Sequence, residues 1–440
     1  MIRDAQGYAL SGASAEAAGH HDRAVRAFNL GCGNAIGLFE AAIAAAPDFV
    51  LAHIGRAWLF ALATDPGATA TARGLAEAAR RLKMNPREAS LFAALDMTIQ
   101  GAQLRATLAL DRHLFDHPHD ILAHEAGFLL DLFLGRTRAL RDRPARALPL
   151  WASDMPGYGA LRAFHAFGLE ESGDYARAED EARQAAVIDP LGFWPHHTVS
   201  HVMEMQGRSR DGLTWMRERE ALWATPEHVT QAHIWWHRAL FHIELGETGE
   251  ALALLDGPIG ATQLPLGVSL TNASALLWRL SLVGCDVGDR WAPLVAIWQG
   301  HADGKCSVFC DLHALMAELG AGDDSAVERR LVSMRTTAAS GLEAAACYRD
   351  VGLPLAEGLV AFWHGAYEQA AWYLHPVRLE TVAIGGSHAQ RDIMDLTLTE
   401  AALRGGLRDM AVGLAHERLA LRPHSSMNQA FLQRAEGLAR

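Results

Sequence analysis

The sequence predicts an all-α protein built from stacked helical hairpins, because two residue types recur at similar intervals between Ala/Leu-rich segments of helical periodicity. Prolines recur every 32–39 residues, at Pro47, Pro86, Pro118, Pro156, Pro190 and Pro226. Glycines recur out of phase with them, at Gly101, Gly135, Gly173, Gly207, Gly246 and Gly365. No run of alternating β-branched residues is long enough to predict a sheet.

Each hairpin follows from the preferences of these two residues. Glycine is favoured at a helix C-terminus and proline in the first turn of the next helix. The chain therefore repeats as helix A, a glycine turn, helix B and a proline turn, with a period of about 34–36 residues, close to that of tetratricopeptide (TPR) repeats. In the clearest copy, Gly173 to Pro190, Ala178, Ala182 and Ala185 let two helices approach closely. We expect the hairpins to stack into a TPR-like superhelix (an α-solenoid) that curls tightly around a central pocket.

The strength of the period divides the chain into four segments. Residues 1–24 form an N-terminal extension, and residues 25–256 carry TPR-like helical repeats. From 257 to 345 the period weakens and polar stretches such as HADGKCS lengthen the loops, which predicts irregular helical repeats. TPR-like repeats resume over 346–440.

Charge and composition exclude several classes of protein. The net charge is −12 and the basic residues are scattered, which argues against a nucleic-acid partner. The longest uncharged run, 257–278, contains two prolines and is a poor membrane span. No N-terminal segment resembles a signal peptide, and five scattered cysteines do not form a disulfide framework, so we expect a cytoplasmic protein.

The repeat register places four histidines together. His197 and His233 are both seven residues after their prolines, and His201 and His237 are both eleven residues after them. Residues four apart share a helix face, and equivalent positions on adjacent A helices point the same way. We therefore expect a patch of four imidazoles on the concave surface, with Glu204 at its border.

Further polar groups reach the same groove if the superhelix closes on itself. They are Asp311 and His313, Arg349 and Asp350, and His388, Gln390, Arg391 and Asp392; Trp236 lies beside the second histidine pair. We expect His201, His237, Glu204, Asp311 and His313 to act as acid–base groups. The remaining polar residues and Trp236 would bind the ligand, with the arginines as clamps for a carboxylate.

Metal binding is a second interpretation of the four histidines. Pairs four residues apart are a familiar ligand spacing, so His197, His201, His233 and His237 form a candidate site for a divalent metal. No HEXXH motif is present, and neither a nucleotide loop nor a dinucleotide fingerprint occurs. His53, His124 and His196 each stand six residues after a proline, a recurrence that repeat packing explains better than chemistry.

Four segments carry a resemblance to a known family. FWPHHTVSHVMEM, HIWWHRALFHIELGE, YRDVGLPL and GGSHAQRD resemble, in the same order, signature segments of the tetratricopeptide repeat protein 38 (StaR-like) family. The resemblance runs from about residue 25 to residue 435. It implies an all-helical TPR-like protein of the cytoplasm and brings no settled reaction with it. The matching positions include most of the groove residues named above.

Two functions remain open from the sequence. The chain is either an enzyme or small-molecule binder with a His-rich pocket, or a scaffold that binds a peptide or protein along its groove without catalysis. Peptide-binding TPR grooves use Asn, Lys and Arg clamps, whereas this groove is rich in His, Trp and acidic residues. The sequence favours the small polar or carboxylate-bearing ligand.

Overall fold

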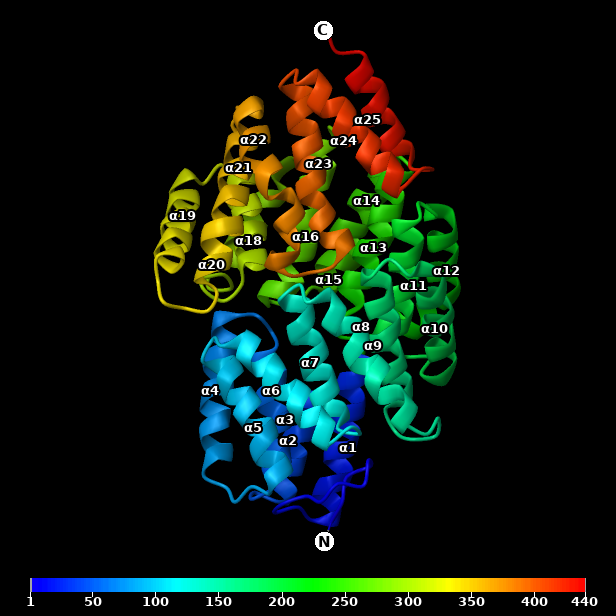
Figure 1. Cartoon of the computed structure of the whole chain (residues 1–440), viewed down its shortest axis with the longest axis vertical. Helices are drawn as coiled ribbons and strands as arrows, with labels where there is room; N and C mark the ends of the chain where they lie inside the picture. Colours follow the sequence, from blue (N-terminus) through cyan, green and yellow to red (C-terminus); the bar gives the residue numbers. More distant parts are fainter. Residues whose placement is uncertain (1, 440) are drawn as a thin grey trace. The chain divides into compact units, whose positions relative to one another are not determined.

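A computed structural model describes residues 2–439, and nearly all of its regular structure is helical (Figure 1). The all-α prediction is confirmed for these residues, where the only β structure is a pair of isolated bridges. The chain divides into two compact units. The first comprises Met1–Val199 and Glu220–Thr230, and the second Ser200–Arg219 and Gln231–Arg440.

The first unit consists of antiparallel helical hairpins. Its helices are α1 (Ala15–Leu30), α2 (Ala35–Ala45), α3 (Val50–Ala61), α4 (Pro66–Arg80), α5 (Pro86–Ile99), α6 (Gln103–Asp116), α7 (Ile121–Phe133), α8 (Thr137–Ala147), α9 (Tyr158–Glu171) and α10 (Tyr175–Ile188). Helices α11 (Phe193–Met205) and α12 (Ser209–Trp223) each contribute residues to both units. The first helix starts at Ala15, inside the segment predicted as an extension.

The second unit continues the hairpins with less regular connections. Its helices are α13 (Gln231–Glu244), α14 (Thr248–Leu254), α15 (Gly260–Thr262), α16 (Gly267–Leu282), α17 (Trp291–Trp298), α18 (Val308–Gly320), α19 (Asp324–Ala338), α20 (Ala345–Cys347), α21 (Leu353–Trp363), α22 (Tyr367–Leu374), α23 (His388–Arg404), α24 (Arg408–Leu421) and α25 (Ser426–Glu436). Between α14 and α15 the helix is interrupted at Gly257, which has non-helical φ/ψ of −97° and −108° and precedes Pro258. This break accounts for the weakened period there.

The α9–α10 hairpin illustrates the predicted glycine turn and the predicted contact between small residues. Gly173 ends α9 with φ of +81°, a left-handed conformation that strains any residue with a Cβ. Its N–H donates to the carbonyl of Glu170 at 2.9 Å, which satisfies one of the last carbonyls of the helix. Ala178, Ala182 and Ala185 are fully buried on α10. The predicted glycine turn and small-residue contact are therefore both present.

The histidines six residues after a proline fasten the proline turns. The Nε2 atoms of His53 and His124 each lie 2.9 Å from the carbonyl oxygens of Pro47 and Pro118. His196 repeats the arrangement with Pro190 at 2.7 Å. A carbonyl only accepts, so the imidazole donates and spans the turn into the following A helix. These three histidines are packing residues, as the repeat position predicts.

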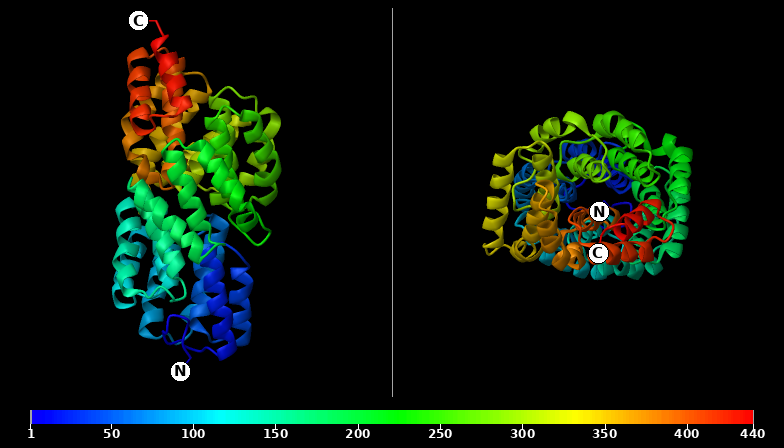
Figure 2. Two further views of the ribbon diagram at one scale, coloured as in Figure 1. Left: turned by 90° about the vertical axis from the view of Figure 1, so that its right-hand side faces the viewer. Right: turned by 90° about the horizontal axis from the view of Figure 1, so that it is seen from above.

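The second unit closes on itself around α16. The indole Nε1 of Trp278 in α16 donates to Thr397 Oγ1 of α23 at 2.9 Å. At the far end of the unit, the Ser425 hydroxyl that caps α25 donates to Glu244 Oε1 of α13 at 2.8 Å. Figure 2 (right) shows the helices of this unit following one another around a ring, from green through yellow to red. This closure brings residues more than 180 positions apart into one interior.

A search of the described residues for membrane-spanning helices finds none that is long and apolar enough. All five cysteines are free thiols. Cys310 is buried within α18, in line with a packing role.

Candidate functional site

The site is built on α11 and α13, the two A helices that follow the fifth and sixth regularly spaced prolines. His201 lies on α11, and His233 and His237 lie one turn apart on α13. The ring centroids of His201 and His237 are 4.5 Å apart, and those of His233 and His237 are 4.8 Å apart. These three imidazoles, all in the second unit, are therefore in contact, as the repeat register predicts.

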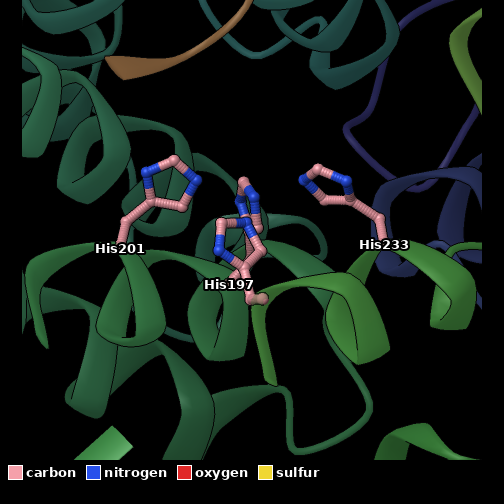
Figure 3. Close-up of side chains that lie close together, drawn as sticks. His197, His201 and His233 are labelled. Carbon is pink, nitrogen blue, oxygen red and sulfur yellow. The ribbon is translucent and has the colours of Figure 1, made fainter. Parts of the chain in front are cut away.

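His197 lies one turn before His201 on the continuous helix α11. Within the second unit, one ring nitrogen from each of His201, His233 and His237 lies within 4.8 Å of the others. Figure 3 shows the imidazoles of His201 and His233 on one side of the helices that carry them, with His197 labelled one turn from His201. The three predicted histidines of the second unit therefore share one location.

Two oxygen acceptors orient the imidazole rings of His233 and His237 on α13. Glu204 Oε2, one turn beyond His201 on α11, lies 3.0 Å from Nδ1 of His237. Asn272 Oδ1, on α16, lies 2.7 Å from Nδ1 of His233. A carboxylate oxygen and an amide oxygen both accept hydrogen bonds, so each Nδ1 carries the proton. The Nε2 atoms of both rings then hold lone pairs.

Burial sets the charge of these groups. It lowers the pKa of His233 to about 4, with a smaller lowering by the neighbouring His201 and against the hydrogen bond to Asn272, which raises it. Burial, together with His201, His233 and Arg279, lowers the pKa of His237 well below its usual value. Burial raises the pKa of Glu204, although Arg422 and Arg279 act in the opposite direction. The imidazoles of His233 and His237 are therefore neutral at pH 7.

Trp236 and Arg279 form one wall of the site. The indole of Trp236 stacks on His233 with an interplanar angle of 14° and a centroid separation of 5.2 Å. The guanidinium of Arg279, on α16, lies 5.3 Å from the centre of the same indole. Trp236 and the adjacent Trp235 are both buried, so the two indoles pack into the interior on different sides of α13.

A cavity of about 40 Å³ lies beyond Glu204 and is lined by Glu204, Arg279, Asp392 and Arg422, with apolar side chains of α13 and α16. Arg418 binds Asp392 through both guanidinium NH groups, at 2.8 and 3.1 Å, and keeps the pKa of that carboxyl low despite burial. The hydrogen bonds of Arg279 go to the backbone carbonyls of α16 and α23. Its burial lowers its pKa to about 10.

The other residues predicted from GGSHAQRD begin α23. Gln390 completes a capping box with Ser387, and Arg391 donates to the Gly386 carbonyl, so both fix the start of the helix. His388 is the half-buried first residue of that helix. Of this group, the structure places Asp392 in the wall of the cavity.

Asp311 and His313 lie on α18 in separate environments. Asp311 accepts hydrogen bonds from Tyr348 at 2.6 Å, from Arg330 at 3.0 Å and from the Gly304 amide at 2.9 Å. Burial raises its pKa to about 6. His313 donates from Nδ1 to the carbonyl of Phe309, one turn earlier, at 2.7 Å. Among the described residues, neither one hydrogen-bonds to the four histidines.

Arg349 and Asp350 lie on the surface. Their side chains are 58% and 59% exposed and bind each other at 2.8 Å. The Arg349 guanidinium is thus paired with the carboxylate of its sequence neighbour Asp350. The structure does not bring this pair to the histidines.

Three residues of the site were not predicted: Asn272, Arg279 and Arg422. Asn272 and Arg279 belong to α16, in which Arg279 is the only charged residue. A single arginine within an otherwise uncharged helix was the available signal, because a buried charge needs a local reason. Arg422 follows the end of α24, and no sequence pattern connects it to Glu204.

No protein-family model matches the chain. Several solved structures are similar to it. A tetratricopeptide repeat protein from Parabacteroides merdae is 14% identical, with a TM-score of 0.35 over 63% of this chain and 99% of that one. A human IFIT1 dimer with m7Gppp-AAAA is 13% identical, with a TM-score of 0.43 over 95% and 94%. The P58(IPK) TPR domain is 13% identical, with a TM-score of 0.23 over 80% and 98%.

The helical hairpins described above define the chain as an all-α helical-repeat protein of TPR-like construction. Its distinguishing feature is a buried group of histidines next to a small charged cavity.

Proposed function

We propose that this TPR-like protein binds a small polar or carboxylate-bearing ligand in the cavity beside Glu204, and that His237, His201 and Glu204 supply acid–base groups to it. The observation that carries the proposal is the arrangement of Glu204, which contacts His237 at 3.0 Å and also lines the cavity. A carboxylate that accepts a hydrogen bond from an imidazole N–H and also faces a cavity can take a proton from a bound group and return it.

Arg279 is the group that selects the ligand. It is buried, lines the cavity and uses its hydrogen bonds on backbone carbonyls, whereas the neighbouring Asp392 is engaged by Arg418. A buried guanidinium without a contacting carboxylate is costly, and a ligand carboxylate would offset that cost. The cavity of about 40 Å³ has room for roughly three water molecules, which suits the head of a small organic acid.

The test is a thermal-shift screen of the full chain against small mono- and dicarboxylic acids at neutral pH. We expect at least one acid to raise the melting temperature in a saturable manner. Arg279→Met should abolish this shift, and Arg290→Met, at a partly exposed surface arginine, should preserve it. A screen without any stabilising acid, or an Arg279→Met protein that responds like the wild type, would refute the proposal.

The alternative is a scaffold that holds a peptide or protein along its helices. It predicts a stoichiometric partner in pull-downs whose binding survives Arg279→Met. Assignment to the tetratricopeptide repeat protein 38 family and a cytoplasmic location are parts of the same proposal. The shared segments support the first, and the five free cysteines support the second.

A further inference from the structure

The four histidines raise a question that ligand binding in the cavity does not answer. The cavity lies on the Nδ1 side of His237, where Glu204 is, whereas the Nε2 atom of that ring faces away from Glu204. His201 contacts His237 at a centroid distance of 4.5 Å, and His233 contacts it at 4.8 Å. The lining of the cavity does not include these histidines, so the acid–base role that acts through Glu204 does not explain why several imidazoles are grouped together.

The hydrogen-bond partners of His233 and His237 resemble those of metal-bound histidines. A histidine that binds a metal donates its other ring N–H to a carboxylate, an amide or a carbonyl, which fixes the tautomer and the ring orientation. His237 does so with Glu204 at 3.0 Å, and His233 does so with Asn272 at 2.7 Å. Each ring is thereby fixed in the tautomer that carries its lone pair on Nε2, which is the form that coordinates a metal ion.

The spacing suits a transition metal. Zinc binds imidazole nitrogens at 2.0–2.1 Å in a tetrahedral array, which places the ligand atoms about 3.3 Å apart. The ring nitrogens of His201, His233 and His237 lie within 4.8 Å of one another, so closure around an ion requires side-chain shifts of at most about 1.5 Å. Imidazoles favour zinc, copper, nickel and iron over calcium and magnesium, which prefer oxygen ligands.

We propose that His201, His233 and His237 bind a divalent transition metal ion through imidazole nitrogens, with Glu204 and Asn272 orienting the rings of His237 and His233. Three histidines are the ligand set of many zinc sites that keep an open coordination position. A metal here would also relieve the cost of burying several polar rings together.

The experiment uses the full chain, stripped with a chelator and dialysed. It is titrated with zinc against a chromophoric chelator and with cobalt(II) by visible absorption. We expect one ion per chain and a cobalt spectrum typical of tetrahedral nitrogen coordination. His201→Gln and His237→Gln should each abolish stoichiometric binding. Glu204→Gln should weaken affinity about 10–100-fold, as loss of an outer-shell partner does.

His124→Gln is the matched control, because His124 is also buried but belongs to a proline turn of the first unit. The metal binding of His124→Gln should equal that of the wild type. His197→Gln tests whether His197, one turn before His201 on α11, also takes part. Circular dichroism checks the fold of every variant, and the wild-type titration decides the matter even if a variant unfolds. A stripped wild type that takes up less than about 0.1 equivalent of either metal would overturn the proposal.

The metal proposal and the carboxylate proposal fail separately. The acid screen on stripped and on zinc-loaded protein tests the cavity, whereas the titration tests the histidines. Arg279→Met should leave zinc affinity within about tenfold of the wild type, because Arg279 is not a ligand.

Discussion

Glu125 offers a quantitative test of the packing in the first unit. It lies on α7, is 2% exposed, and accepts a hydrogen bond from Asn29 Nδ2 at 2.5 Å. Burial raises the pKa of its carboxyl from 4.5 to about 8, and the Asn29 bond only partly counteracts this. Glu125→Gln replaces it with a neutral side chain of the same shape that can still accept from Asn29.

The expected effect depends on pH. The folded protein keeps Glu125 protonated up to about pH 8, whereas the unfolded chain loses that proton above 4.5. Each pH unit in this window therefore costs the wild type about 1.4 kcal/mol of stability, a loss that begins as the pH rises through 4.5 and is complete near pH 8. Glutamine carries no such cost. Glu125→Gln should be about 3 kcal/mol more stable than wild type at pH 7, and nearly equal to it at pH 4.5.

The assay is urea unfolding at pH 5, 7 and 9, followed by circular dichroism and tryptophan fluorescence. The difference in midpoints multiplied by the shared m-value gives the change in unfolding free energy. Glu77→Gln is the control, because Glu77 is exposed and pairs only with Arg80 on the surface, so its effect should stay below about 0.5 kcal/mol at every pH. A stability gain for Glu125→Gln that does not grow between pH 5 and pH 9 would refute the assigned burial.

Two further predictions concern the turns. Gly173→Ala should lose about 1–2 kcal/mol of unfolding free energy because it places a Cβ at φ of +81°. Gly74→Ala, in open space on α4, should instead gain about 0.5–1 kcal/mol. Equal melting temperatures of the two variants would contradict this prediction. His124→Gln should cost about 1 kcal/mol at pH 7.5 through the lost bond to Pro118. That deficit should turn into a gain of about 1 kcal/mol at pH 5, because the pKa of His124 is about 4 in the folded state against 6.5 in the unfolded chain, and the wild type loses about 2 kcal/mol of stability as the pH falls over that range. Urea midpoints at the two pH values would show this change of sign.

The repeat architecture was accessible from sequence because its causes are local. A left-handed glycine such as Gly173 ends a helix wherever it stands, and Pro190 can only precede the next one. The contact between His201 and His237 was accessible too, because stacked repeats keep equivalent positions side by side.

The remainder of the site depends on tertiary closure. Arg422 and Asp392 reach the cavity only because α23 to α25 return to α13, a step that no local pattern encodes. Arg349 looked like a carboxylate clamp, but Asp350 neutralises it at the surface. Asp311 instead belongs to a network with Tyr348 and Arg330, whose members are separated by 19 and 37 positions in the chain.

The bond between Ser425 and Glu244 has a consequence for biosynthesis. The wall of the cavity needs Arg422, and the bond that fastens α25 to α13 needs Ser425, which stands 181 positions after Glu244 in the chain. A ribosome delivers these residues long after α11 and α13 have left the exit tunnel. A nascent or prematurely terminated polypeptide would carry every histidine of the group and still lack a finished cavity.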